Sequence, residues 1–95
     1  MKYVDWDEEK NKKLKKERGV SFEEVLIFIQ KEKVLEVIDQ PNQKRYLNQK
    51  IFIVIIDNYV YMVPFKEDTE KFFLKTIIPS RKMTKKYIKK GGENI

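Results

Sequence analysis

The order of charged residues near the start of the chain predicts a first helix. Acidic side chains come first in this stretch and basic ones mostly later, an order that the helix dipole favours. Gly19 then stands where a helix C-cap belongs, because glycine readily adopts the left-handed conformation of that position. We therefore expect a helix from Trp6 or Asp7 to Arg18.

A capping box at Ser21-Phe22-Glu23-Glu24 predicts a second helix. The Ser21 side chain can cap the first turn while Glu24 reaches back to the Ser21 backbone. Apolar residues then follow helical spacing at Phe22, Val25, Leu26 and Ile29. We expect this helix to run from about Phe22 to Lys31.

The middle of the chain has the pattern of β-strands. Val34–Ile38 is a short strand-like run, and the polar segment Gln40–Gln49 is expected to be a loop or a frayed strand pair. Ile51–Ile56 is a continuous apolar run, typical of a central strand covered on both faces. Asp57-Asn58 is a two-residue turn signal, so Tyr59–Phe65 should return antiparallel to it.

That turn fixes the register of the predicted hairpin. It places Ile56 opposite Tyr59, Val54 opposite Tyr61 and Phe52 opposite Val63. Pro64 lacks an amide hydrogen, so it should mark a bulge, an edge or a strand end.

The last third of the chain predicts one more strand and one more helix. Lys66–Glu70 is a charged loop, and Phe72–Ile78 is expected to be a strand that Pro79 closes. Ser80 can cap a third helix running to about Lys90, and residues 91–95 should form a loose tail.

These elements predict one α+β domain spanning residues 1–95. Two N-terminal helices precede an antiparallel sheet of three to four strands, and a basic helix ends the fold. The helices should pack mostly on one face of the sheet.

The charge of the chain is concentrated near its C-terminus. The net charge is +6, and residues 71–92 hold eight basic side chains and no acidic one. A charge balance this uneven favours a polyanionic partner, of which nucleic acid is the commonest. The alternative is a lysine-rich surface in a chain that uses lysine throughout, although abundance alone does not explain the segregation.

Composition excludes several kinds of site. Cysteine is absent, so the chain has no disulfide, no thiolate zinc site and no thiol nucleophile; histidine, the usual general base, is absent too. We expect no metal and no cofactor. Acidic residues occupy the place of a signal-peptide core, and Ile51–Ile56 is too short to span a bilayer, so we expect a soluble cytoplasmic protein.

The start of the last predicted helix is the first candidate binding site. Arg81 and Lys82 follow the cap, where cations oppose the helix dipole but where backbone N–H groups can bind an anion. A phosphate could turn this conflict into a benefit, or the two side chains could simply bend into water. The outer side of the helix carries Lys82, Lys85, Lys86 and Lys89. These lysines could lie along a phosphate backbone or on an anionic membrane, and we expect no membrane partner because the apolar stripe is narrow.

Other candidates lie upstream of this helix. Lys75 either extends from a strand edge into water or points into a cleft, where desolvation would suit it to proton transfer. Tyr61 is one of several tyrosines that are either core residues or platforms for an unpaired base. Glu67 is either a solvated loop charge or a carboxylate beside the basic region.

Three stretches of the chain share their order and spacing with one known family. They are Asp5-Trp6-Asp7-Glu8-Glu9-Lys10-Asn11, Gly19-Val20-Ser21-Phe22-Glu23-Glu24 and Ile78-Pro79-Ser80-Arg81-Lys82-Met83-Thr84-Lys85-Lys86-Tyr87. Together they resemble the BrnT-type toxins, small ribonucleases of bacterial type II toxin–antitoxin systems. The chain departs from the family at Arg18, where a histidine is common, and at Pro79-Ser80, where the family usually has Ser-Ala. The middle of the chain does not align cleanly, and Arg45 or Lys50 would fill the place of the family's basic residues there.

The resemblance implies a RelE-like fold, sequence-tolerant RNA cleavage and a cognate antitoxin. It implies a toxin–antitoxin hetero-oligomer or a homodimer. Under it, Arg81 would clamp the transition state, Lys75 and Lys82 would bind phosphate or move a proton, and Glu67 or Tyr61 would be the base. Two alternatives stay open: a nucleic-acid-binding module without catalysis, and a partner-binding protein without RNA activity.

Overall fold

The computed structural model describes residues 2–89. It contains six strands and three helical segments. The strands are β1 (Tyr3–Trp6), β2 (Glu36–Asp39), β3 (Gln49–Ile56), β4 (Tyr59–Glu67), β5 (Lys71–Leu74) and β6 (Ile78–Pro79). The helical segments are α1 (Glu8–Arg18), α2 (Phe22–Gln30) and α3 (Arg81–Thr84), the last continued by the π-helical turn η1 (Lys85–Lys89). The α+β class predicted from the sequence is confirmed.

The first two helices form close to where the sequence predicts them, but α1 begins at Glu8, because Trp6 belongs to β1 and Asp7 is the N-cap. The Asp7 side chain accepts the N–H of Glu9 at 2.9 Å and caps α1, and Gly19 ends this helix with a φ of 67°. Both hydrogen bonds of the predicted capping box are present at the start of α2. That helix ends at Gln30, one residue earlier than expected.

The predicted hairpin is confirmed with its register. Ile56 pairs with Tyr59, Val54 with Tyr61 and Phe52 with Val63. Both turn residues, Asp57 and Asn58, have the positive φ that this tight turn requires. Pro64 lies within β4 opposite Ile51, and β4 continues to Glu67, so part of the predicted charged loop is strand.

The sheet is mixed rather than wholly antiparallel. Its strands are ordered β1-β5-β4-β3-β2, with β6 paired to β4. The prediction of three or four antiparallel strands did not include β1. This strand pairs in parallel with β5, from Tyr3 opposite Lys71 to Trp6 opposite Leu74. The N-terminal segment Tyr3–Trp6 is therefore an edge strand.

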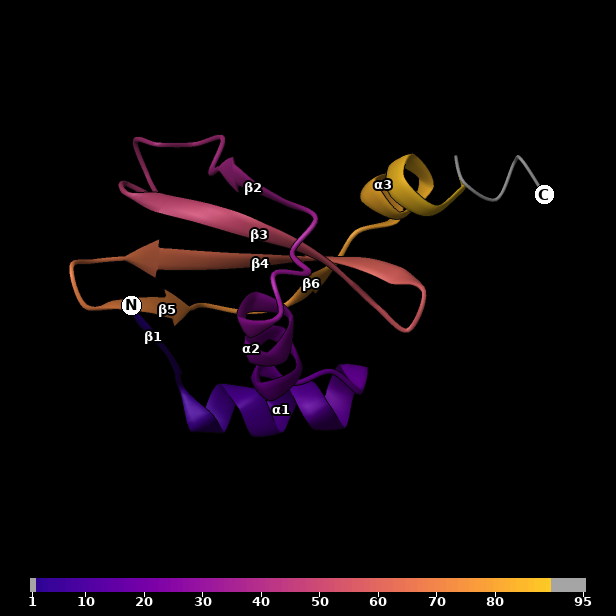
Figure 1. Cartoon of the computed structure of the whole chain (residues 1–95), viewed down its shortest axis with the longest axis horizontal. Coiled ribbons are helices and arrows are strands. Elements are labelled where there is room, and N and C mark those ends of the chain that lie inside the picture. The colour runs from indigo at the N-terminus through magenta and orange to yellow at the C-terminus, as the bar shows by residue number, and fades with distance from the viewer. Residues whose placement is uncertain (1, 90–95) are drawn as a thin grey trace.

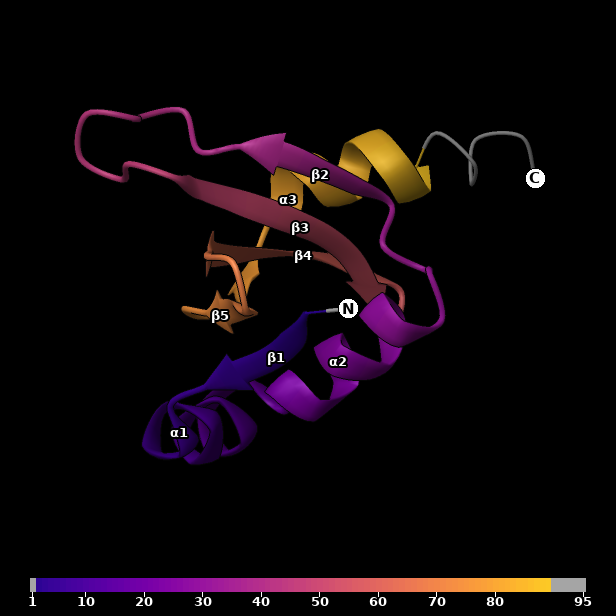
Figure 2. The same ribbon diagram turned by 60° about the vertical axis from the view of Figure 1, so that its left-hand side comes forward.

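Helices cover both faces of the sheet. We call the first face the core face; its side chains, including Phe52, Val54 and Phe65, pack with residues of α1 and α2. We call the other face the open face; there Ile53 and Val60 pack with residues of α3 and η1. Figures 1 and 2 show α1 and α2 together on one side of the sheet and α3 on the other, near β2 and β3. Two helices share one face as expected, but the basic helix does not join them.

Candidate nucleic-acid interface

A β-bulge separates β5 from β6. The β4–β5 register pairs Phe65 with Leu74, whereas the β4–β6 register pairs Met62 with Ile78. Three residues therefore lie between the paired positions of one strand against two in the other, so one extra residue is inserted. For this reason the strand predicted over Phe72–Ile78 is broken into two short ones.

The bulge lies in a segment that we call the strap (residues 75–80). At its start the Lys75 N–H donates to the carbonyl of Pro64 at 2.8 Å, and at its end the Ser80 N–H donates to the carbonyl of Val60 at 3.0 Å. Both ends are thus fastened to β4. Arg81 follows directly as the first residue of α3.

The strap lines one wall of a pocket with a volume of about 480 Å³. Its lining residues are Gln40, Tyr46, Gln49, Pro64, Lys75, Thr76 and Ile78. Lys75 is the one charged side chain of this lining, and Tyr46 provides an aromatic surface from the loop between β2 and β3. Such a pocket offers a cation for a phosphate and a ring on which a base can stack.

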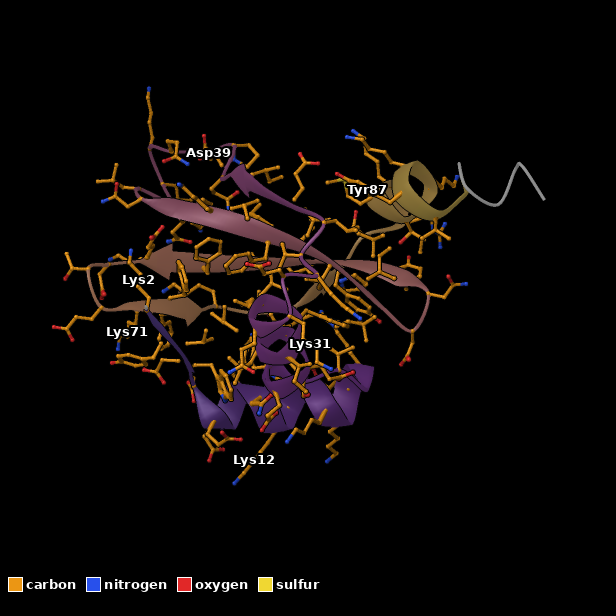
Figure 3. All side chains as sticks on the ribbon, in the orientation of Figure 1. Lys2, Lys12, Lys31, Asp39, Lys71 and Tyr87 are labelled. Atoms are coloured by element: carbon orange, nitrogen blue, oxygen red, sulfur yellow. The ribbon has the colours of Figure 1, made fainter. Side chains whose placement is uncertain are left out.

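Lys75 lies beside an aromatic ring on the open face. Its Nζ is 5.5 Å from the centre of the Phe73 ring, a cation–π contact. Lys71 approaches the same ring at 5.7 Å, but it is bound to Asp5 at 3.2 Å, and this hydrogen bond raises the pKa of Lys71. Figure 3 shows Lys71 at the β5 end of the sheet.

The basic helix stands on the open face through one apolar stripe. Ser80 caps α3 by accepting the N–H of Met83 at 3.1 Å. Met83, Tyr87 and Ile88 form this stripe and pack against the sheet. The Tyr87 hydroxyl also donates to Glu36 of β2, which raises the pKa of Tyr87; Figure 3 places this side chain beside α3.

The exposed cations of the strap, α3 and η1 form no ion pair in the described residues. The ion pairs found in residues 2–89 are Lys2–Glu67, Lys15–Glu23 and Lys71–Asp5. Five predicted site residues are exposed and absent from these pairs: Lys75, Arg81, Lys82, Lys85 and Lys86. The Lys89 backbone belongs to η1, and its side chain lies outside the described residues.

Of the two basic residues proposed for the middle of the chain, Arg45 lies nearer the pocket. Its guanidinium is 5.5 Å from the ring of Tyr46, which lines the pocket. Lys50 pairs with Phe65 and so belongs to the core face, where it lines a different cavity that Glu67 also lines.

The structure does not bring Glu67 and Tyr61 into the pocket that Lys75 lines. Glu67 pairs with Phe72 on the core face and is held by Lys2. Tyr61 also lies on the core face, where burial, and then the charge of Asp57, raises the pKa of its phenol.

Sequence reasoning missed two features of the interface. Thr76 enters the pocket wall only because of the bulge, for which the sequence gives no local signal. Lys66 pairs with Phe73 and Gln49, so it lies on the open face next to the pocket. If the alternation of inward and outward side chains along β4 had been extended beyond Phe65, it would have placed Lys66 on the open face.

The described residues contain neither a membrane-spanning helix nor a metal-binding cluster. Among residues 2–89, no helix combines the length and apolar character needed to cross a membrane. Over the same range, no group of three or more acidic side chains has an arrangement that could hold a metal ion.

Comparison with protein families identifies the family of this chain. A family model described as a ribonuclease toxin, BrnT, of a type II toxin–antitoxin system matches residues 6–86. This match confirms the resemblance seen in the sequence, and its range includes the strap, Arg81 and the first lysines of the basic helix. Comparisons with curated proteins and with solved structures gave no match.

Proposed function

The chain belongs to the BrnT family of ribonuclease toxins of type II toxin–antitoxin systems, and we propose that it cleaves RNA on the open face of its sheet. Lys75 and Arg81 are the residues to which we assign the chemistry. Family membership implies RNA as substrate and an antitoxin as partner.

One observation carries this proposal. Five exposed cations without an ion pair in the described residues lie on the strap, α3 and η1, and one of them lines the pocket beside Tyr46. An ordinary lysine-rich surface would be expected to mix the two charge signs, as α1 does. The cluster therefore favours a polyanion that follows the basic helix into the pocket.

The proposed reaction is attack of a 2′-oxygen on the adjacent phosphorus. The bond from phosphorus to the 5′-oxygen breaks, a 2′,3′-cyclic phosphate forms, and the leaving oxygen takes up a proton. Arg81 supplies a fixed, two-pronged donor for the charge that builds up on the phosphoryl oxygens. Lys75 holds the phosphate and can give its proton to the leaving 5′-oxygen.

The spacing of these two residues suits one phosphodiester and its neighbours. Lys75 is hydrogen-bonded to Pro64, and Ser80, which directly precedes Arg81, is hydrogen-bonded to Val60. Pro64 and Val60 are four positions apart on β4. Four strand residues span about 13 Å, which two long side chains can bridge when they reach toward each other.

Neither Glu67 nor Tyr61 acts as the general base in this mechanism. Glu67 is paired with Lys2 on the core face, and the raised pKa of Tyr61 keeps its phenol protonated at neutral pH. We propose instead that the 2′-hydroxyl loses its proton to solvent and that fixed cations provide most of the rate enhancement.

RNA binding is proposed to continue along the basic helix. Lys82, Lys85 and Lys86 are exposed in consecutive turns, and Lys89 follows in the sequence. Arg45 would contact the strand on the other side of the pocket, next to Tyr46. Because these contacts address the backbone, they would give affinity without sequence preference.

The proposal is tested by cleavage of a labelled RNA in the presence of EDTA. A matched RNA with 2′-O-methyl groups throughout serves as control, because it keeps the phosphates but lacks the nucleophile. We expect cleavage of the unmodified RNA alone, with cyclic phosphate at the new 3′ ends. Intact RNA, or equal cleavage of both substrates, would contradict the mechanism. Salt-dependent binding without cleavage would indicate a binding module instead.

A further inference from the structure

One main-chain group of the strap is directed away from the sheet. Ser80 bonds to Val60, and bonded and non-bonded residues alternate along an antiparallel ladder, so the carbonyl of Ile77 points away from β4. On the other side, β1 ends at Trp6, which pairs with Leu74. The carbonyl therefore lies at an edge that no strand covers in the described part of the chain.

Arg18 binds this carbonyl. Its Nη1 donates to the oxygen of Ile77 at 2.5 Å, joining residues 59 positions apart in the sequence. Ile77 is fully buried, so its carbonyl has little access to water and needs a protein donor. Arg18 is the last residue of α1, and the C-cap at Gly19, which donates to the carbonyl of Lys15 at 3.1 Å, fixes where the side chain starts.

We propose that Arg18 is a positioning residue for RNA cleavage. It holds the middle of the strap so that Lys75 at one end and Arg81 beyond the other keep their places on the open face. This inference rests on the proposed function, since it concerns the residues to which that function is assigned.

The bulge makes such an anchor necessary. A strand with one extra residue can slip into the neighbouring register, and a slip of one residue moves each side chain to the opposite face. In the strap, that slip would carry Lys75 out of the pocket while leaving the helices and the hairpin in place. A charged, planar guanidinium is a stronger and more directional donor than a neutral group, which suits it to hold one register.

The test compares Arg18→Met with Arg18→Lys and with Lys16→Met. Arg18→Met keeps an unbranched side chain but removes the donor, whereas Arg18→Lys restores a cationic donor. Lys16 is an exposed cation in the same last turn of α1 and is absent from the ion pairs of the described residues, so its substitution controls for lost charge. Each protein is measured for amide hydrogen exchange, for RNA affinity and for the single-turnover cleavage rate.

We expect Arg18→Met to speed exchange at the Lys75 and Ser80 amides by about tenfold or more, since these hydrogen bonds hold the ends of the strap. Its cleavage rate should fall by about 10- to 100-fold while RNA affinity changes less than about twofold, because misplaced groups lose rate rather than binding. Arg18→Lys should recover part of both losses, and Lys16→Met should match the wild type.

Unchanged exchange or an unchanged rate in Arg18→Met would overturn the proposal. So would a rate loss that disappears at low temperature, where a merely destabilised protein is fully folded. If the wild type cleaves no RNA, the proposed function fails and the positioning role fails with it. Hydrogen exchange does not depend on activity. It therefore shows whether Arg18 holds the strap even if the wild type cleaves no RNA, and it distinguishes the two failures.

Discussion

The N–H of Val60 donates to the hydroxyl oxygen of Thr84 at 2.9 Å, which fastens the basic helix to β4. Val60 is fully buried, so without the Thr84 hydroxyl its N–H could not bond to water instead and would be left unsatisfied. Thr84→Val should therefore reduce the free energy of unfolding by about 1–3 kcal/mol, measured by urea denaturation. Thr69→Val, the same change in an exposed loop, should have an effect within about 0.5 kcal/mol. Equal effects of the two changes would show that the hydrogen bond to Val60 does not matter.

Asn11 joins the first two helices from a fully buried position. Its side-chain oxygen accepts the N–H of Phe22 at 2.8 Å, and its Nδ2 donates to Glu23 at 2.8 Å. Asn11→Ala leaves both partners without this bond, so unfolding should require about 2–3 kcal/mol less free energy. Lys12→Ala is the control; Figure 3 shows Lys12 pointing away from the sheet below α1. A melting temperature of Asn11→Ala equal to that of the control would contradict the expectation.

The same contact gives stability a dependence on pH. The hydrogen bond from Asn11 lowers the pKa of Glu23 below its ordinary value near 4.5. A carboxyl group with a lowered folded-state pKa stabilises the fold above its unfolded-state pKa, and this stabilisation is lost as pH falls through the folded-state pKa. Glu23→Gln should thus be less stable than the wild type at pH 7, and the difference should shrink toward zero in acid.

Urea denaturation between pH 7 and pH 3 measures this difference. Glu17→Gln, an exposed change on α1, serves as the matched control. A difference between Glu23→Gln and the wild type that stays constant over the whole range would rule out the linkage.

The lysines of η1 should set the salt dependence of RNA affinity. Each lysine that contacts a single-stranded phosphate adds about 0.7 to the slope of log affinity against log salt. Lys85→Gln combined with Lys86→Gln should therefore reduce the magnitude of the slope by about 1.4. The pair Lys12→Gln and Lys13→Gln removes the same charge from α1 and should leave the slope unchanged. Equal slopes for the two double variants would place the RNA elsewhere.

Local signals in the sequence were enough for the first half of the fold. The caps of α1 and α2 depend on residues within one turn, and the register of the hairpin depends on the turn at Asp57-Asn58. The strand β1 has no such signal, because its partner β5 lies almost 70 positions later in the sequence. A four-residue strand that pairs only at long range cannot be recognised by periodicity alone.

The candidate site divides in the same way. Lys75 and the basic helix could be chosen from charge and spacing, but the pocket wall depends on a bulge defined by three separate strands. The alternation of side chains along β4 could have separated Tyr61 and Glu67 from the site, since both have the parity of the buried Val63 and Phe65. The sequence analysis instead assigned Tyr61 and Glu67 to the site because they lie near the basic region along the chain.

The most direct test compares cleavage by variants on the two faces of the sheet. Single-turnover cleavage of a labelled RNA in EDTA is measured for Lys75→Met and Arg81→Ala, and for Glu67→Gln and Tyr61→Phe as matched changes on the core face. We expect the first two to lose at least about 100-fold in rate and the last two to stay within about threefold of the wild type. Loss of cleavage in the core-face variants, with activity retained in Lys75→Met and Arg81→Ala, would contradict the assignment of RNA cleavage to the open face.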